Sequence, residues 1–85
     1  MKTFHYEITD EIGIHARPAG LLVKEAKKYS SKVILHVNGK SAEATKLMAI
    51  MSLGVKHGQT VEVTVEGADE DTAFEGIKVF FEQNL

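Results

Sequence analysis

The sequence contains no cysteine, no tryptophan and only one proline. Without cysteine, the chain can form neither a disulfide framework nor a thiolate metal site. No apolar run approaches the ~20 residues that a membrane-spanning helix needs, and residues 1–7 have no signal-peptide apolar region. We therefore expect a cytoplasmic protein that does not insert into a membrane.

An excess of positive charge is missing as well. The 10 lysines and arginines are outnumbered by 12 aspartates and glutamates, which gives a formal net charge of -2. Because proteins that bind nucleic acid are usually strongly basic, this balance argues against such a partner. Apolar residues make up 44% of the 85 positions, so we expect one compact domain over residues 1–85.

Four segments alternate between apolar and polar residues, the pattern of half-buried strands. They are residues 3–9, 33–37, 40–44 and 60–66. Between the second and the third lies Asn38-Gly39, the strongest short signal for a hairpin because both residues tolerate positive φ. A two-residue turn makes the strands that it joins antiparallel.

Three further segments show helical signals. The first runs from about Pro18 to Tyr29, with its start near residues 16–18, because proline suits a first helical turn. The second is the apolar segment 45–54, with Thr45 as the expected N-cap and Gly54 as the expected C-cap. The third follows an acidic stretch at residues 69–71, where the helix dipole favours negative charge. Its expected buried stripe is Ala73, Ile77, Phe80 and Phe81.

The element order is therefore βαββαβα. Each strand has one apolar face, so the simplest solution is one antiparallel sheet that carries all the helices on one side. This predicts an α+β fold.

The residues between the first strand and the first helix carry the most distinctive chemistry. They read Gly13-Ile14-His15-Ala16-Arg17-Pro18. An imidazole nitrogen can accept a phosphoryl group and pass it on, since its bond to phosphorus is labile. Unpaired N–H groups of a first helical turn favour an anion, and the Arg17 guanidinium suits phosphate oxygens. By itself, a lone histidine at a helix start more often caps the helix or lies on the surface.

The second helix has two apolar faces at 100° per residue. Ala49, Ile50 and Leu53 share one face, which we expect in the core. The other face carries Leu47, Met48 and Met51, which we expect to be exposed and to suit a partner surface. The alternative from periodicity alone is that both faces are core. On the first helix, a solvent-facing line is expected at Arg17, Gly20, Lys24 and Lys27.

The stretch 13–19 resembles the active-site signature of the HPr family, the histidine phosphocarriers of the phosphoenolpyruvate–sugar phosphotransferase system. Residues 38–42, 47–54 and 67–70 also resemble HPr proteins, so the likeness covers essentially the whole chain. It implies an open-faced β-sandwich, a four-stranded antiparallel sheet in the order 1-4-2-3 with three helices on one face.

The resemblance also implies a mechanism. Enzyme I hands its phosphoryl group to His15 Nδ1, Arg17 and the backbone of residues 16–18 contact the phosphate, and IIA domains of sugar permeases receive it. The exposed face of the second helix and the basic line would dock these partners. We therefore predict a monomeric carrier, not a self-contained enzyme, with no cofactor. A paralogue of a nitrogen-type or regulatory branch is the alternative.

In one place the sequence departs from the family's pattern. Many Gram-positive HPr proteins begin the second helix with a serine that HPr kinase phosphorylates, and the resemblance places Lys46 at this position. Lysine cannot accept the phosphate. We therefore predict that HPr kinase leaves the protein unmodified. Thr45 is a possible substitute acceptor, although we expect its hydroxyl to cap the helix.

The other histidines are expected to be incidental. In the order 1-4-2-3, His5 and His36 lie on the outer sheet face with one strand between them, about 10 Å apart. We expect this distance to be too long for a shared metal ion, so we predict no metal site. His57 is expected in a solvent-exposed turn. An RNA-binding sheet is a further alternative, but it would need aromatic and basic residues on the outer face.

Overall fold

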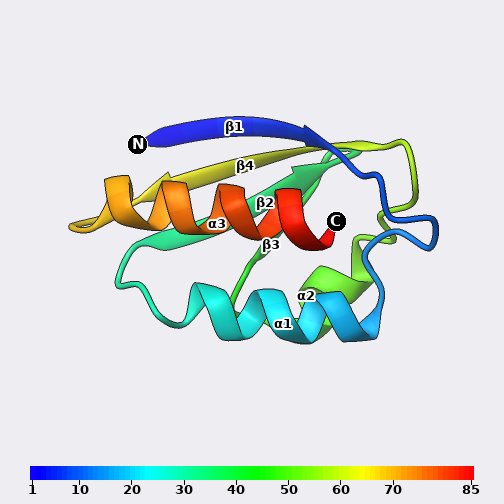
Figure 1. Cartoon of the computed structure of the whole chain (residues 1–85), viewed down its shortest axis with the longest axis horizontal. Helices are drawn as coiled ribbons and strands as arrows, with labels where there is room; N and C mark the ends of the chain where they lie inside the picture. Colours follow the sequence, from blue (N-terminus) through cyan, green and yellow to red (C-terminus); the bar gives the residue numbers. More distant parts are fainter.

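The computed structural model describes residues 1–85 and has seven elements (Figure 1). They are β1 (Lys2–Glu7), α1 (Ala16–Ala26), β2 (Lys32–Val37), β3 (Lys40–Glu43), α2 (Leu47–Ser52), β4 (Thr60–Glu66) and α3 (Glu70–Asn84). The βαββαβα order expected from the sequence is confirmed.

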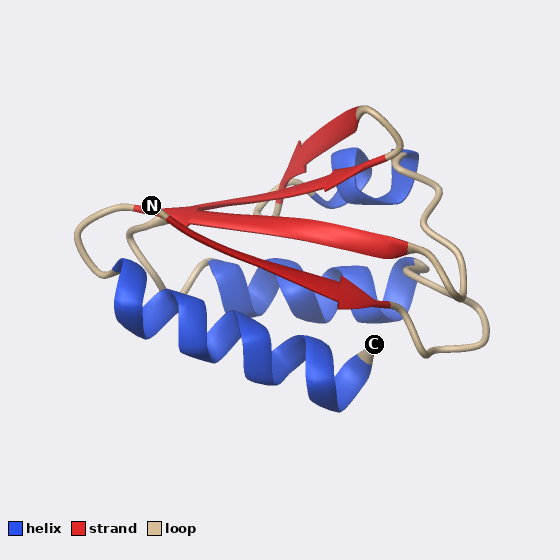
Figure 2. Ribbon diagram, turned by 90° about the horizontal axis from the view of Figure 1, so that it is seen from above, coloured by secondary structure: helices blue, strands red, loops and turns tan.

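The strands form one sheet in the order β1-β4-β2-β3, and all neighbouring strands are antiparallel. Asn38 and Gly39 join β2 to β3 with φ of 52° and 76°, as the hairpin turn requires. The helices lie on one side of the sheet, and its other face stays open (Figures 1 and 2). The sequence-based expectation of an open-faced sandwich is therefore confirmed.

The core lies between the sheet and the helices and contains 22 buried apolar residues. Val61, Val63 and Val65 on β4 have no exposed surface, because β4 lies in the interior of the sheet. The four residues expected on the buried stripe of α3, Ala73, Ile77, Phe80 and Phe81, are all buried. On the outer face, polar residues and Ile34 alternate with these core positions, and no phenylalanine or tyrosine is found among them. This face lacks the stacking platform that an RNA-binding sheet needs.

Three helix boundaries differ from the sequence-based expectations. The helix α1 ends at Ala26, before Tyr29. In α2 the N-cap is Lys46, whose side chain makes no capping hydrogen bond, so the assignment of Thr45 as the cap is wrong. The N–H of Lys46 donates to the carbonyl of Glu43, a turn that carries the chain one residue beyond Thr45 before the helix starts. At the other end the C-cap is Leu53, so the assignment of Gly54 as the C-cap is wrong by one residue. Gly54 follows the cap with a φ of 63°, the left-handed conformation in which glycine stops a helix.

Candidate functional site

The loop from β1 to α1 is held by its own turn and by the segment after α2. The N–H of Ile12 donates to Asp10 Oδ1 at 2.9 Å, and that of Gly13 to the Asp10 carbonyl at 3.0 Å. The buried residue Ile14 then donates its N–H to the carbonyl of Val55 at 3.1 Å. These bonds fix the backbone immediately before His15.

His15 is the N-cap of α1, and its backbone is extended, with φ of -112° and ψ of -174°. Its carbonyl accepts the first helical hydrogen bond, from the N–H of Ala19 at 2.9 Å, but its side chain caps nothing. The imidazole is half-buried and remains available for chemistry. The expected helix start at residues 16–18 is confirmed.

The first turn of α1 leaves backbone donors beside this imidazole. The N–H groups of Ala16 and Arg17 make no hydrogen bond within the chain, and Pro18 has no N–H to satisfy. The Arg17 side chain is exposed and forms no ion pair. Unpaired donors at the positive end of a helix, with a free guanidinium nearby, favour a bound anion.

His15 and Arg17 line an open cavity of about 220 Å³. The other residues of its wall are Asp10, Pro18, Leu21, Gln83 and Asn84. Sequence reasoning did not identify Asp10, Gln83 or Asn84. Nothing in their local pattern marks them, because the end of α3 meets the start of α1 only through tertiary packing.

The carbonyl of Leu85 joins the end of α3 to the loop before His15. It accepts the N–H groups of Thr9 and Asp10 at 2.5 and 2.8 Å, and the Thr9 hydroxyl at 2.9 Å. Leu85 is 2% exposed, so its packing in the core also holds the end of α3 in place. The cavity is therefore bounded by segments that are bonded to each other.

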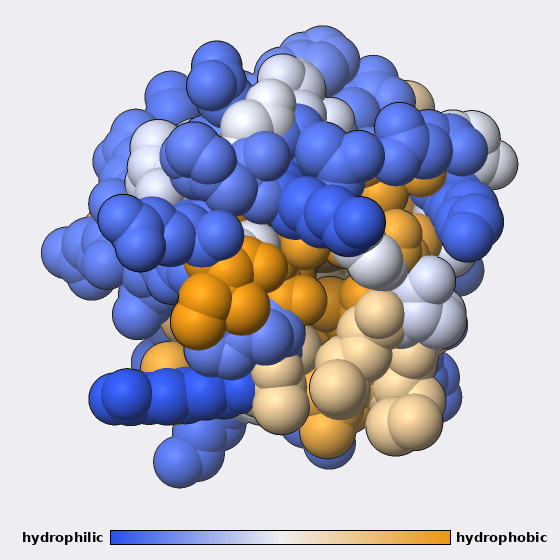
Figure 3. Space-filling model, turned by 90° about the vertical axis from the view of Figure 1, so that its right-hand side faces the viewer, coloured by the Kyte–Doolittle hydropathy of each residue, from blue (hydrophilic) through white to orange (hydrophobic).

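The two faces expected of α2 are present. Leu47, Met48 and Met51 are exposed, with Met48 reaching 75%. Ile50 and Leu53 are buried, and Ala49, also expected in the core, is partly buried against it. We call the three exposed residues the α2 surface. The same end of the molecule carries Ile12, which is 68% exposed and was not identified from the sequence. Figure 3 shows apolar residues gathered on this end, bordered by hydrophilic ones.

The predicted line on α1 also faces solvent. Arg17, Lys24 and Lys27 are exposed and pair with no carboxylate. Gly20 lies among them with open space where a Cβ would stand, since no atom comes within 4 Å of that point. We call these four residues the α1 line. The α1 line is a basic strip that begins two residues after His15 and has no side chain at Gly20.

The remaining candidates lie elsewhere. His57 is exposed in the turn before β4, and Lys46 is exposed at the start of α2. His5 and His36 lie on the outer sheet face, and neither lines the cavity of His15. As the side chains stand, no three His, Cys, Asp or Glu residues are grouped to hold a metal ion. No helix has the length and apolar character needed to cross a membrane.

Comparison with protein families matches residues 2–83 to the family described as the HPr component of the phosphotransferase system, with its phosphorylation site. The chain belongs to the HPr family of phosphocarrier proteins. It is 38% identical to the HPr of Mycoplasma genitalium, over 99% of this chain and 97% of the relative.

Solved HPr structures share the fold. The HPr of Thermoanaerobacter tengcongensis superposes with a TM-score of 0.92 at 40% identity, covering 98% of this chain and 93% of the other. A crystal structure of an HPr dimer from the same organism gives a TM-score of 0.77 at 40% identity, covering 98% and 95%. Members of this family are phosphocarriers and not self-contained enzymes.

Proposed function

We propose that His15 accepts a phosphoryl group on Nδ1 from phosphorylated enzyme I and passes it to IIA domains of sugar permeases. The observation that supports this most directly is the position of His15 at the N-cap of α1, with its side chain free of any capping bond. The unpaired N–H groups of Ala16 and Arg17 lie in the same turn.

The transfer needs only groups that this site offers. In its neutral form the imidazole carries a lone pair on Nδ1 that can attack phosphorus. As the bond from phosphorus to Nδ1 forms, the bond to the donor's leaving atom breaks. The Arg17 guanidinium and the backbone donors then stabilise the charge on the phosphoryl oxygens. Onward transfer runs through the same steps in reverse, with the IIA domain as acceptor.

Partner docking would use the α2 surface and the α1 line. The α2 surface supplies exposed methionine, whose flexible side chain adapts to differently shaped partners. The α1 line supplies unpaired positive charge that attracts acidic partner surfaces. Both lie beside His15, so a partner seated on them would hold its own reactive residue near Nδ1.

The proposal is tested by incubation with phosphoenolpyruvate, Mg²⁺ and the cognate enzyme I. We expect acid-labile, alkali-stable phosphate on the wild-type protein and none on His15→Ala. The matched control is His57→Ala, which removes an exposed histidine outside the site and should be phosphorylated at the wild-type rate. Unchanged incorporation in His15→Ala, or no incorporation into the wild type, would refute the assignment.

Regulation by HPr kinase is not expected. Lys46 occupies the serine position of the family's pattern, and lysine carries no hydroxyl. Of the nearby hydroxyls, that of Ser52 donates to the carbonyl of Ala49 at 2.8 Å, and Thr45 is half-buried. We expect HPr kinase with ATP to add no alkali-labile phosphate, measured by mass spectrometry. Stable phosphate on Thr45, Ser41 or Ser52 would contradict this.

We further propose that the protein acts in the cytoplasm as a monomer. The α2 surface and the α1 line must then stay open to partners. Because a dimer of the Thermoanaerobacter tengcongensis HPr has been crystallised, sedimentation at the working concentration is the direct test. A paralogue of a nitrogen-type branch would share His15 and differ in its partners. Rates of phosphorylation by the two kinds of enzyme I would discriminate between the branches.

A further inference from the structure

The wall of the His15 cavity contains one group that repels anions. Asp10 is the only acidic residue among the seven that line this cavity, which it shares with His15 and Arg17. Its carboxylate forms no ion pair, so its negative charge is not matched by a bound cation. A phosphoryl group on His15 would therefore meet this carboxylate as well as the Arg17 guanidinium.

The loop holds the Asp10 carboxylate in this place. One carboxylate oxygen, Oδ1, accepts the N–H of Ile12 at 2.9 Å. The backbone N–H of Asp10 donates to the carbonyl of Leu85 at 2.8 Å, and its carbonyl accepts the N–H of Gly13 at 3.0 Å. The side chain can therefore turn away from the cavity only if it loses its hydrogen bond to Ile12.

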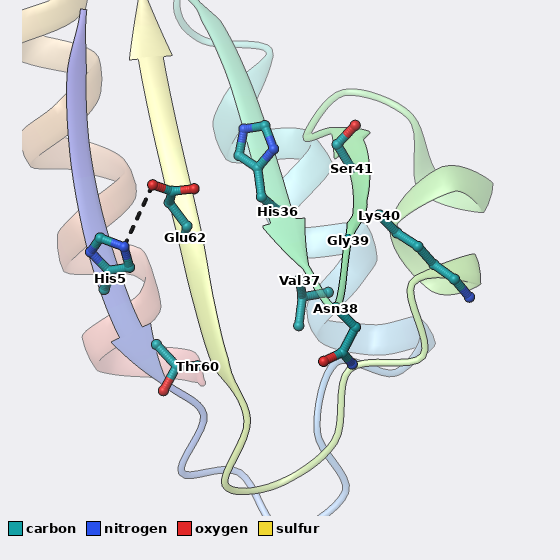
Figure 4. A pocket seen from close by; sticks show the side chains of 9 residues that line it. All are labelled: His5, His36, Val37, Asn38, Gly39, Lys40, Ser41, Thr60 and Glu62. Carbon is teal, nitrogen blue, oxygen red and sulfur yellow. Dashed lines mark ion pairs between the residues drawn. The ribbon is translucent and has the colours of Figure 1, made fainter.

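A second carboxylate lies beside a histidine, but on the outer face of the sheet. Glu62 Oε2 is 3.5 Å from His5 Nε2. Figure 4 shows this pair on neighbouring strands, on the side of the sheet that carries no helix. Neither residue lines the cavity of His15. Glu62 therefore offers a comparison in which the same charge lies near an imidazole outside the site.

We propose that Asp10 destabilises the phosphorylated state of His15 and thereby favours release of the phosphoryl group. The inference rests on the proposed function, in which His15 must give up the group as well as accept it. The Arg17 guanidinium and the free N–H groups of Ala16 and Arg17 stabilise the bound group. The Asp10 carboxylate repels it, because a phosphoryl group carries about two negative charges at neutral pH. Asp10 therefore offsets part of the stabilisation.

The open shape of the cavity limits the size of this effect. Water enters an open cavity and weakens the repulsion, so we expect a change of about three- to tenfold and not a block of phosphorylation. The repulsion should also depend on salt, because about 1 M salt shortens the screening length to about 3 Å. Salt dependence therefore distinguishes an electrostatic role of Asp10 from a purely structural one.

The test compares Asp10→Asn with Glu62→Gln, since each variant loses one negative charge. Asparagine and serine can both accept the N–H of Ile12, so Asp10→Asn and a second variant, Asp10→Ser, keep the turn. Urea denaturation checks that all of them fold. Potassium phosphoramidate phosphorylates the full chain without enzyme I: its P–N bond breaks, ammonia leaves, and a bond from phosphorus to the imidazole forms. Mass spectrometry then follows hydrolysis at His15, in which water attacks phosphorus and the imidazole is released.

We expect Asp10→Asn and Asp10→Ser to lose phosphate from His15 about three- to tenfold more slowly than the wild type, because the repulsion is gone. Glu62→Gln should match the wild type, and the differences should shrink in about 1 M KCl. Equal rates in Asp10→Asn and Glu62→Gln, or a difference that salt does not reduce, would overturn the proposal. Failure of enzyme I to phosphorylate the wild type would instead refute the proposed function, and it would not alter the hydrolysis rates.

Discussion

At the scale of single residues, the position of His15 depends on Gly13. Gly13 has a φ of 88°, a conformation that residues with a side chain adopt only with strain. An added Cβ would lie 2.3 Å from the carbonyl oxygen of Val55 and 2.7 Å from the Cα of Lys56. Only glycine lets this loop pack against the segment after α2. That packing positions His15 at the start of α1.

We predict that Gly13→Ala destabilises the protein by about 2 kcal/mol or more, because left-handed backbone strain and a backbone clash add together. Urea denaturation measures the loss. Gly20→Ala is the matched control, since Gly20 lies in α1 with open space around its Cβ position. Its helix propensity should raise stability by about 0.5–1 kcal/mol. Equal losses in the two variants would contradict this account.

At the scale of elements, α2 combines a buried face with the exposed face that we propose for partner docking. Within six residues it buries Ile50 completely while leaving Met48 75% exposed. Side chains of one short helix point in different directions at 100° steps, so a core face and a partner face can coexist. Substitutions on the two faces should therefore have different consequences.

We predict that Met48→Glu changes stability by less than about 0.5 kcal/mol, as is usual for exposed positions. It should nevertheless raise the KM for the proposed phosphoryl transfer from enzyme I by about tenfold, because a charge would replace an apolar contact at the proposed docking surface. Steady-state kinetics of enzyme I at varied concentrations of this protein measure the KM. Val79→Glu, which alters an exposed apolar residue on α3, should leave KM unchanged. The prediction is wrong if both variants behave alike.

The packing of α1 against α3 depends on a second glycine. A Cβ at Gly76 would lie 1.8 Å from the Tyr29 hydroxyl oxygen and 2.7 Å from its Cζ. That hydroxyl donates to Glu25 Oε2 at 2.8 Å, and the carboxylate raises the pKa of Tyr29 above its ordinary value. The tyrosine ring after α1 therefore closes over the middle of α3, where only glycine leaves room.

We predict that Gly76→Ala lowers the stability of the wild-type protein but raises the stability of a Tyr29→Ala variant. In the wild type it should destabilise the protein, because the Tyr29 ring must move and its bond to Glu25 is lost. In a Tyr29→Ala background it should stabilise by up to about 1 kcal/mol, the helix propensity gained by replacing glycine. Chemical denaturation of all four proteins gives the coupling. Additive effects would show that the two residues do not interact.

At the scale of the whole molecule, Asp69 joins the beginning of β2 to the beginning of α3. Its carboxylate accepts the hydroxyl of Ser31 and the N–H groups of Ser30 and Ser31, the last two at 3.0 and 2.9 Å. The hydrogen bond from the Ser31 hydroxyl, followed by those from the backbone, lowers the pKa of Asp69 below its ordinary value. Residues 38 positions apart in the chain are held together at this point.

A lowered pKa in the folded state means that this contribution to stability is present above the unfolded pKa of about 4. It is lost as the pH falls through the lower, folded-state value. We predict that Asp69→Asn destabilises the protein at pH 7 and that the difference from the wild type shrinks on acidification. Denaturation over a range of pH measures it. Glu66→Gln, which alters an exposed carboxylate on β4 with no hydrogen bond or ion pair, should show little difference at any pH.

The sequence determined whatever depends on local periodicity and turn chemistry. Alternating valines predicted β4, Asn38-Gly39 predicted the hairpin, and the two faces of α2 followed from 100° steps. Local signals failed at the start of α2, where a turn from Glu43 to Lys46 moves the cap past Thr45.

Only the tertiary structure decided which distant residues meet. Gln83 and Asn84 come to the wall of the His15 cavity because Leu85 is bonded to Thr9 and Asp10. Glu62 stands between His5 and His36 because the register of three strands places it there. Periodicity indicates which face a residue points to, whereas strand register and helix packing select its neighbours, and these are properties of the whole folded chain.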